Sequence, residues 1–187
     1  MKARESGMPE RDMWERFFDP LKIITTLGIS LHTADVAEFG CGYGTFTFPA
    51  ARIIRGAIYA LDIEPDLVQA VREEAKRQNL RNVNVILKDF MAEGSGLQDE
   101  SVDYVMLFNI LHLENPAILF NEAKRILRQE GSVGMIHWNY DPSTPRGPSM
   151  SIRPKPQDCI DWAQEAGFHS PKKYDLKPYH YGIIMKK

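Results

Sequence analysis

The amino-acid sequence predicts an α/β protein with a doubly wound, mostly parallel sheet. From about residue 34 onward, short aliphatic runs alternate with segments of helical period. The runs lack a clean polar face, which is typical of parallel strands covered on both sides. Near the end of the chain, two strand-like runs flank a polar segment at 175–178, which predicts an antiparallel hairpin. A parallel sheet with one antiparallel edge accounts for these features.

The individual elements follow from the same patterns. Buried strands are expected at 34–39, 57–61, 83–87, 102–108 and 132–137, and the hairpin strands at 168–174 and 179–185. Helices are expected at 45–55, from Pro65 with Leu67, Val71 and Ala75 inward, from Pro116 with Leu119, Ala123 and Ile126 inward, and from Pro156 to Gly167. Ligands of such sheets bind beyond the carboxyl ends of the strands, so candidate site residues are sought there.

The length of the chain fits one domain with a helical cap. The chain has 187 residues, a size typical of a single domain. We assign residues 31–187 to the α/β core and residues 1–30 to an N-terminal helical cap. Three large aromatic residues, Trp14, Phe17 and Phe18, gather in the cap. They predict a partial lid over the ligand cleft, and the alternative is a static helix that completes the core.

Charge and cysteine content exclude several classes of protein. There are 23 Lys and Arg against 25 Asp and Glu, a formal net charge of −2, which offers no overall attraction to nucleic acid or to an anionic membrane. Two cysteines are too few for a disulfide framework or a cysteine-rich zinc site, so no metal centre is predicted. No apolar leader is visible, and the most apolar run, 104–111, is too short to span a bilayer. We therefore expect a cytoplasmic protein.

A glycine-rich turn follows the first predicted strand. Glu38 precedes Gly40, Cys41 and Gly42, and the glycines permit a tight turn and close approach of a ligand to the backbone. A dinucleotide-binding fingerprint would have a further glycine where this chain has Thr45. By itself the turn is a weak motif that also arises by chance.

Asp62 stands at the end of the second strand, 22 residues after Gly40. A carboxylate in this place can accept hydrogen bonds from both hydroxyls of a ribose. The alternative is an acid that stabilises the start of the next helix through the helix dipole. The glycine turn in register with Asp62 favours the ribose.

Polar residues also follow the next three strands. Asp89, beside Phe90, can accept a hydrogen bond from an adenine amine or can simply make a turn. Asn109 emerges from an apolar strand, where packing gives no reason for an amide. His112 fits a base, a substrate contact or a histidine satisfied at a helix start, and His137 ends the fifth strand at the same edge.

Taken in order, these motifs resemble those of the class I S-adenosylmethionine-dependent methyltransferases. The resemblance lies in segments 36–44, 60–65, 88–90, 102–112, 124–127 and 131–132. It implies a Rossmann-like methyltransferase fold of seven strands in the order 3-2-1-4-5-7-6, with strand 7 antiparallel. It also implies S-adenosylmethionine as the cofactor and methyl transfer as the activity.

The resemblance also implies which residues contact the cofactor. It places Glu38 near the amino group, Gly40, Cys41 and Gly42 along the methionine part, Asp62 at the ribose, Ile63 against the adenine, Asp89 at the adenine amine with Phe90 beside it, and Asn109 and Ile110 beside the sulfonium. All of them stand at or just beyond the ends of predicted strands.

The methyl acceptor is expected to be a small molecule rather than a nucleic acid. The sequence lacks the Asn/Asp-Pro-Pro-Tyr motif of amino-methylating nucleic-acid enzymes and has no large inserted substrate domain. Segment 138–154 leaves the sheet at the ligand edge and offers Trp138 and Tyr140 as walls for the acceptor. Arg146 and Arg153 can bind an anionic group of the acceptor, unless both are solvated surface charges.

Catalytic residues and competing functions stay open at this stage. His112 and His137 are the candidates for a general base, which is needed only if the acceptor has a high pKa. A nicotinamide oxidoreductase on a similar sheet is the competing enzyme, and Thr45 disfavours it. The competitor from another class is a non-catalytic module that keeps the cofactor pocket.

Overall fold

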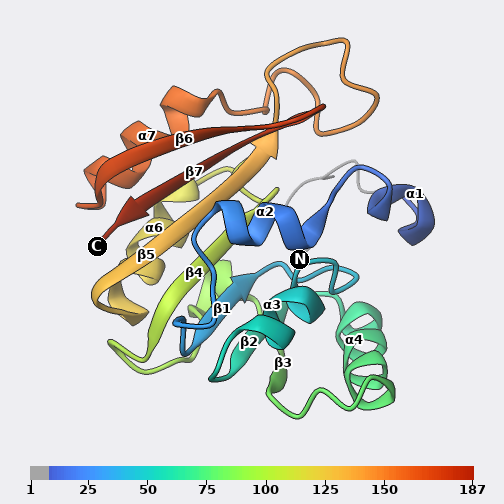
Figure 1. Cartoon of the computed structure of the whole chain (residues 1–187). Coiled ribbons are helices and arrows are strands. Elements are labelled where there is room, and N and C mark those ends of the chain that lie inside the picture. Colours follow the sequence, from blue (N-terminus) through green and yellow to red (C-terminus); the bar gives the residue numbers. More distant parts are fainter. Residues whose placement is uncertain (1–8) are drawn as a thin grey trace.

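The computed structural model describes residues 9–187, which form one seven-stranded sheet with helices on both faces (Figure 1). The strands are β1 (Val36–Phe39), β2 (Ile58–Asp62), β3 (Val83–Leu87), β4 (Val102–Phe108), β5 (Leu127–Trp138), β6 (His169–Leu176) and β7 (His180–Lys186). The helices are α1 (Arg11–Glu15), α2 (Pro20–Thr26), α3 (Thr47–Ile53), α4 (Pro65–Arg77), α5 (Phe90–Glu93), α6 (Pro116–Ile126) and α7 (Pro156–Glu165). Within residues 9–187, none of these helices has the length and apolarity that a membrane crossing requires.

The sheet order is β3-β2-β1-β4-β5-β7-β6, and β7 runs antiparallel to both of its neighbours. This confirms the predicted topology, including the terminal hairpin. The carboxyl ends of β1, β2 and β4 therefore meet at one edge of the sheet. Residues 1–8 of the predicted cap lie outside the described residues.

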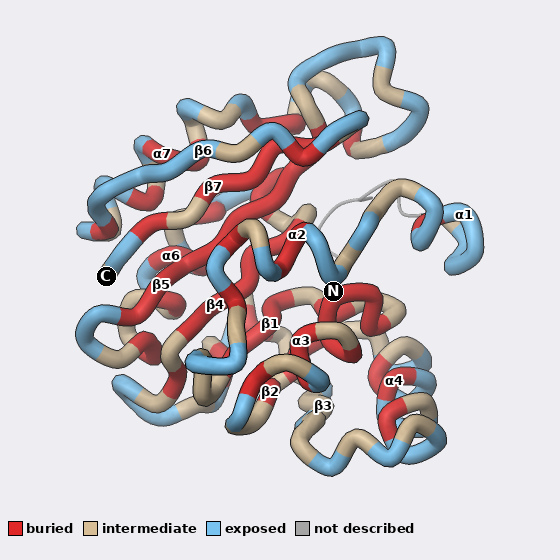
Figure 2. The backbone as a smooth tube through the Cα atoms, viewed as in Figure 1, coloured by how far each residue is buried: buried red, intermediate tan, exposed pale blue. Residues whose placement is uncertain are grey.

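Buried apolar side chains hold the helices against the sheet in two large layers and a smaller cluster that packs α4 against β2 through Val71 and Ala60. One layer lies between the sheet and α6 and α7 and includes Phe39 and Phe120. The other includes Ile24 and Met106 and lies under α2 and α3. Every residue of β1 is buried because this strand pairs with β2 and β4 in the middle of the sheet. Figure 2 shows β6, by contrast, exposed along most of its length.

The predicted boundaries hold for most strands, and β5 is the main exception. It begins at Leu127 rather than at residue 132, because the polar stretch that follows Leu127 hides the first part of the strand in the sequence. Pairing with β4 is interrupted by an irregularity before Ser132. Arg128 fixes this segment, because its guanidinium donates hydrogen bonds to the carboxylates of Asp103 at 2.8 Å and Asp35 at 3.0 Å.

The N-terminal part of the chain divides into a core helix and a peripheral segment. Helix α2 belongs to the core, since Leu27 is fully buried after it and the Tyr104 hydroxyl donates to the Leu27 carbonyl at 2.8 Å. In Figure 1, α1 lies outside the sheet layers. Helix α2 thus completes the core, and it contains none of the three aromatic residues for which the lid is predicted. The lid prediction concerns residues 9–18, which we call the N-terminal aromatic segment.

Candidate active site

The glycine turn after β1 packs closely against the end of β2 and the residues after β4. Gly40 and Gly42 have φ angles of 75° and 52°, in the left-handed region that glycine adopts without strain. A Cβ at Gly40 would lie 2.8 Å from the side chain of Ile110. The backbone N–H groups of Gly40 and Cys41 both donate to the Leu61 carbonyl, at 2.8 and 2.9 Å. These contacts bring the turn, the end of β2 and the residues after β4 together.

Glu38 is a buried acid just before this turn. It is 2% exposed and accepts a hydrogen bond from the Thr47 hydroxyl at the start of α3. Burial is the main cause that raises the pKa of Glu38 to about 8; the Thr47 bond opposes the rise and nearby Asp62 adds to it. An acid with such a pKa keeps its proton at pH 7, and a bound ammonium group would favour the carboxylate instead.

Asp62 is fixed at the end of β2 by the backbone around it. Its Oδ2 accepts a hydrogen bond from the Gly42 N–H at 2.8 Å, and its Oδ1 accepts from the Glu64 N–H at 3.0 Å. Glu64 is only the N-cap of α4, so Asp62 bonds the turn before the helix rather than the first helical turn. Each carboxylate oxygen has a second lone pair. Asp62 is therefore oriented and can still accept hydrogen bonds from a diol.

The residues expected at the adenine end have different surroundings. Ile63 is half-buried just after β2. Asp89 is the N-cap of α5 and its side chain accepts a hydrogen bond from the Ala92 N–H at 3.1 Å. This is the turn-forming role that the sequence offers as the alternative to an adenine contact. Phe90 is buried, with its ring edge-on to Phe39 at 5.3 Å. The expected place of Phe90 beside the adenine stays a prediction, and in this structure its ring packs against the core.

Buried polar atoms without hydrogen-bond partners mark the same edge. Asn109 has a φ of 56°, and its N–H donates to the Ile136 carbonyl at 2.8 Å. Its side-chain oxygen and nitrogen have no partner, and neither has the Thr45 hydroxyl. Buried polar groups are almost always hydrogen-bonded, so these atoms indicate a place for a polar ligand or water. Together with the acids Glu38 and Asp62, they fit the ammonium and ribose groups of S-adenosylmethionine.

Comparison with known proteins decides the family. The sequence model of a family described as Methyltransferase domain matches residues 33–162, well over half of the chain. The chain belongs to this methyltransferase family. Membership implies S-adenosylmethionine as the methyl donor, in agreement with the fit of the residues at the strand ends.

Individual relatives resemble parts of this methyltransferase. Aklanonic acid methyltransferase DauC of a Streptomyces species is 37% identical over 73 residues, which are 38% of this chain and 32% of that protein. A ribosomal-protein methyltransferase of a Thermoanaerobacter species is 29% identical over 96 residues, 51% of this chain and 29% of that protein. The chain thus spans about a third of the length of these relatives. The crystal structure of a methyltransferase from Aquifex aeolicus has a TM-score of 0.84 at 21% identity and covers 95% of this chain and 93% of its own, which shows the shared fold.

The two histidines that the sequence suggests as bases of the methyltransferase lie inside the protein. His137 Nε2 is 3.4 Å from His112 Nδ1. His137 is fully buried, and His112 is 4% exposed. Burial, with the neighbouring His112, lowers the pKa of His137 well below its ordinary value. A ring with no accessible surface does not reach an acceptor directly. A catalytic role of His137 stays a prediction, and in this structure its ring contacts His112 and has no exposed surface.

The sequence predicts that segment 138–154 contacts the acceptor; its first residue ends β5, and we call the following residues, 139–154, the acceptor loop. It extends beyond the tip of β5 in Figure 1. Tyr140 is 45% exposed there, and Arg146 is exposed with Nη2 3.5 Å from the sulfur of Met13. Arg153, however, is buried and donates to oxygens of the loop itself. The anion-binding role expected of Arg153 or Arg146 stays a prediction, and because the donors of Arg153 are engaged within the loop, we pursue it for Arg146.

Trp138 is covered by the N-terminal aromatic segment. The Trp138 side chain is 1% exposed, and its ring lies 5.2 Å from that of Phe17 and 4.3 Å from that of His180. The role of Trp138 as an apolar wall for the acceptor stays a prediction, and in this structure the aromatic segment covers its ring. His180 also contacts the ring of Phe18 at 4.5 Å, and neither of its ring nitrogens has a partner. Burial lowers the pKa of His180 to about 3, so this ring is neutral.

Three residues near the site were missed by reasoning from the sequence. Thr47 holds Glu38, and His180 lies under the aromatic segment. Tyr43 donates from its hydroxyl to the Pro9 carbonyl at 3.1 Å, which links the glycine turn to the aromatic segment. The position of Tyr43 inside the turn was an available signal. The roles of Thr47 and His180 depend on packing that the sequence does not display.

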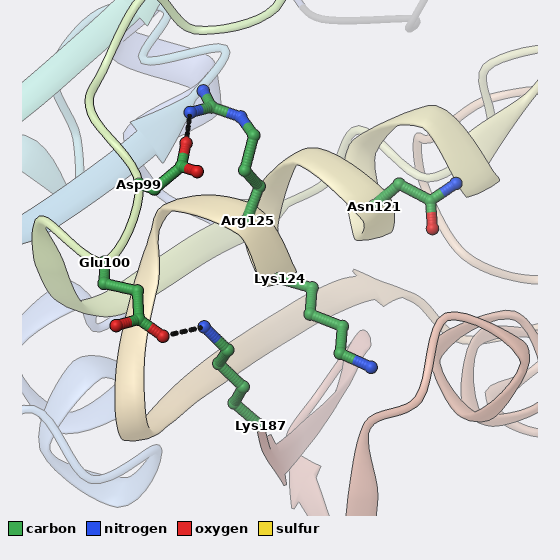
Figure 3. Close-up of a pocket in the computed structure, with 6 residues that line it drawn as sticks. All are labelled: Asp99, Glu100, Asn121, Lys124, Arg125 and Lys187. Carbon is green, nitrogen blue, oxygen red and sulfur yellow. Dashed lines mark hydrogen bonds and ion pairs between the residues drawn. The ribbon is translucent and has the colours of Figure 1, made fainter.

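A hollow lies away from these strand ends. It has a volume of about 590 Å³ and is lined by Asp99, Glu100, Asn121, Lys124, Arg125 and Lys187 (Figure 3). Arg125 is paired there with Asp99, and Lys187 with Glu100 at 3.2 Å. The hollow adjoins the start of β4 and the end of the chain, whereas the glycine turn meets the carboxyl end of β4. It is therefore not part of the methyltransferase site.

Proposed function

We propose that this methyltransferase moves the methyl group of S-adenosylmethionine to a small acceptor that carries an anionic group and binds beside the acceptor loop. The observation that carries the proposal is the convergence of Glu38, Asp62 and Asn109 on the glycine turn, with buried polar atoms that lack partners. The fold by itself would not carry it, since one fold hosts many activities.

Residues suited to each part of the cofactor are present. Glu38 would bind the amino group, Asp62 the ribose hydroxyls, Ile63 and Asp89 the adenine, and the glycine turn the methionine part. When bound, the cofactor supplies a methyl group activated by its positive sulfonium. The contribution of the chain is mainly orientation, which is worth roughly 7–11 kcal/mol when two reactants are held in line.

His112 is the candidate base of the proposed reaction. Its Nδ1 faces Nε2 of the neutral, fully buried His137, which can hold the ring in one orientation. A general base is needed only for an acceptor of high pKa. An acceptor atom that is already anionic needs none, and the inward position of both histidines agrees with such an acceptor.

Two observations support an anionic acceptor. Arg146 is exposed on the acceptor loop, and a guanidinium pairs well with a carboxylate or phosphate. The relative DauC is named for its action on aklanonic acid, and an acid is of the same chemical class. The ribosomal-protein relative instead supports a protein acceptor, which the experiment must therefore include.

The cofactor part of the proposal is tested by calorimetry and thermal unfolding with S-adenosylhomocysteine and with NADH. We expect S-adenosylhomocysteine to bind and NADH not to bind. At 100 times its Kd, a ligand stabilises the folded state by about 2.7 kcal/mol, and a domain of this size then melts several degrees higher. No effect of S-adenosylhomocysteine would remove the proposal, and binding of NADH in its place would favour the oxidoreductase.

The reaction is tested with methyl-labelled S-adenosylmethionine and a matched panel of acceptors. Each carboxylate is paired with its amide and each phosphate with its parent alcohol, and ribosomal protein is added as a competitor. We expect transfer to at least one anion, and about tenfold less to its neutral partner, as a lost charge-assisted hydrogen bond predicts. Transfer only to neutral compounds or to protein would overturn the anionic class. Cofactor binding with no transfer at all would favour the non-catalytic module.

A further inference from the structure

We infer that Arg153 is the positioning residue of the acceptor loop and that, through Trp138, it also fixes where the N-terminal aromatic segment rests. The guanidinium makes six hydrogen-bond contacts, to the carbonyls of Asn139 (3.0 Å), Asp141 (3.2 Å), Arg146 (3.2 Å) and Pro148 (2.8 and 3.1 Å) and to the Thr144 hydroxyl, with the two N–H groups of Nη1 shared among three oxygens. The inference rests on the proposed function only in treating this loop as a wall for the acceptor.

Arginine suits this position for a geometric reason. A guanidinium has five N–H donors in a planar fork, whereas a lysine ammonium has three on one atom. Arg153 is 7% exposed, and the oxygens that it contacts are four carbonyls and one hydroxyl, none of them from a carboxylate. Its charge is solvated by the dipoles of the loop. Residues 139–148 therefore close around a single side chain.

Gly147 brings the loop backbone against Trp138. This glycine has a φ of 111°, and a Cβ on it would lie 2.8 Å from Cγ of Trp138 and 2.9 Å from Nη2 of Arg153. No side chain fits between them. The backbone at this point therefore rests on the guanidinium and on the indole ring together.

Trp138 also contacts the N-terminal aromatic segment. The ring of Phe17 lies 5.2 Å from the Trp138 ring, and that of Trp14 lies 6.5 Å from it. A change in the loop therefore reaches residues 9–18 through Trp138. Arg153 shapes the acceptor wall and the segment beside it without itself contacting the acceptor.

Amide hydrogen exchange on the full chain tests the inference. Arg153→Met removes these hydrogen bonds, and Arg81→Met is the control because it removes an exposed arginine that lies before β3 and outside both segments. We expect residues 139–148 of Arg153→Met to exchange about tenfold faster, as loss of local hydrogen bonds predicts, with a smaller increase at residues 9–18. The ends of β1 and β2 should be unchanged. The Kd for S-adenosylhomocysteine should stay within about twofold of the wild type, since no cofactor residue is altered.

Two further variants distinguish positioning from general stabilisation. Arg153→Lys keeps the charge and three donors, so its loop should exchange at a rate between those of the wild type and Arg153→Met. Gly147→Ala keeps the guanidinium and forces a Cβ against it and Trp138, so it should loosen the same two segments. Gly96→Ala is its control, because Gly96 also has a positive φ, 75°, but its Cβ would meet nothing nearer than 3.9 Å.

Unchanged exchange at residues 139–148 in Arg153→Met and in Gly147→Ala would overturn the inference. An equal increase over all of residues 9–187 would do the same, because it indicates general destabilisation. Faster amide exchange at residues 139–148 with unchanged exchange at residues 9–18 would overturn the coupling through Trp138. If Arg153→Met does not fold, the exchange rates of residues 139–148 and 9–18 in Arg153→Lys and Gly147→Ala test the inference in its place. A wild-type chain that fails to bind S-adenosylhomocysteine would overturn the proposed function instead and leave the loop result standing.

Discussion

The proposed cofactor half and the proposed acceptor half of the ligand edge are built in different ways. At the ends of β1 and β2, Asp62 is fixed by backbone N–H groups of Gly42 and Glu64, which belong to the turns that follow the strands. Beyond β5 and β7, side chains from distant parts of the chain meet, as Phe17 does with Trp138. Strand order thus builds one half, and packing of remote segments builds the other.

The two halves also differ in charge. The proposed cofactor half carries Asp62 and Glu38, whose carboxylate a bound ammonium group would favour, and the proposed acceptor half exposes the guanidinium of Arg146. A donor with a positive sulfonium and ammonium suits the first, and a negative acceptor suits the second. The difference in charge therefore agrees with the proposed pair of substrates, and substitutions in each half should affect different ligands.

The largest expected effect lies in the cofactor half. Asp62→Ala removes the carboxylate proposed to hold the ribose, and loss of charge-assisted hydrogen bonds costs about 1.5–3 kcal/mol. The Kd for S-adenosylhomocysteine should rise about 10- to 150-fold, as calorimetry would measure. Asp66→Ala, in the first turn of α4, is the matched control and should leave the Kd unchanged. Equal affinity of Asp62→Ala and the wild type would place the ribose elsewhere.

The second prediction concerns the pH dependence of cofactor binding. Glu38 has a pKa of about 8 in the free chain, and a bound ammonium group favours its carboxylate. Binding should therefore release a proton below pH 8, and affinity should rise with pH by up to about tenfold per unit between pH 6 and 8. Calorimetry in buffers of different ionisation enthalpy measures the proton. Glu38→Gln should bind more weakly and without this pH dependence, and a flat wild-type profile would contradict the role of Glu38.

The same carboxyl group has a stability effect in the free chain that can be measured separately. Its pKa rises from 4.5 to about 8 on folding, so between these values the folded state holds the extra proton. The protonated carboxyl therefore makes its full contribution to the free energy of unfolding below pH 4.5. That contribution falls by up to about 1.4 kcal/mol per pH unit and is lost as the pH rises through 8. Denaturant unfolding should show a difference between the wild type and Glu38→Gln that grows over this range. Glu64→Gln is an acid-to-amide control just after β2.

The cofactor half was largely predictable from the sequence because strand ends define it. Glu38 and Asp62 each stand at the end of an apolar run, and parallel strands bring such ends to one edge. From the sequence, Arg153 was expected to be an exposed guanidinium that binds an anion. Nothing in a polar, proline-rich segment shows that the backbone will fold around one guanidinium. The burial of Phe90 and His137 likewise depends on neighbours from other elements. Such neighbours are set by tertiary packing, which local patterns do not record.

A smaller effect is expected in the acceptor half. Arg146 is exposed, and exposed ion pairs are weak. Arg146→Ala should therefore raise the KM for the best carboxylate of the acceptor panel about two- to fivefold, with the Kd for S-adenosylhomocysteine unchanged. Arg81→Ala, an exposed arginine before β3, is the control. An unaltered KM would show that the loop selects its acceptor by some group other than this arginine.

The smallest effect belongs to the contact that joins the two halves. Tyr43 lies in the glycine turn, and its hydroxyl donates to the Pro9 carbonyl at 3.1 Å. Cofactor bound at the turn should therefore slow amide exchange in residues 9–18. A neutral hydrogen bond contributes about 0.5 kcal/mol at the low end of its range, which is about a twofold change in protection. Tyr43→Phe should lose that twofold gain, and Tyr140→Phe, on the acceptor loop, should keep it. If S-adenosylhomocysteine leaves the exchange of residues 9–18 unchanged in the wild type, this segment is a static cover, and the two halves act independently.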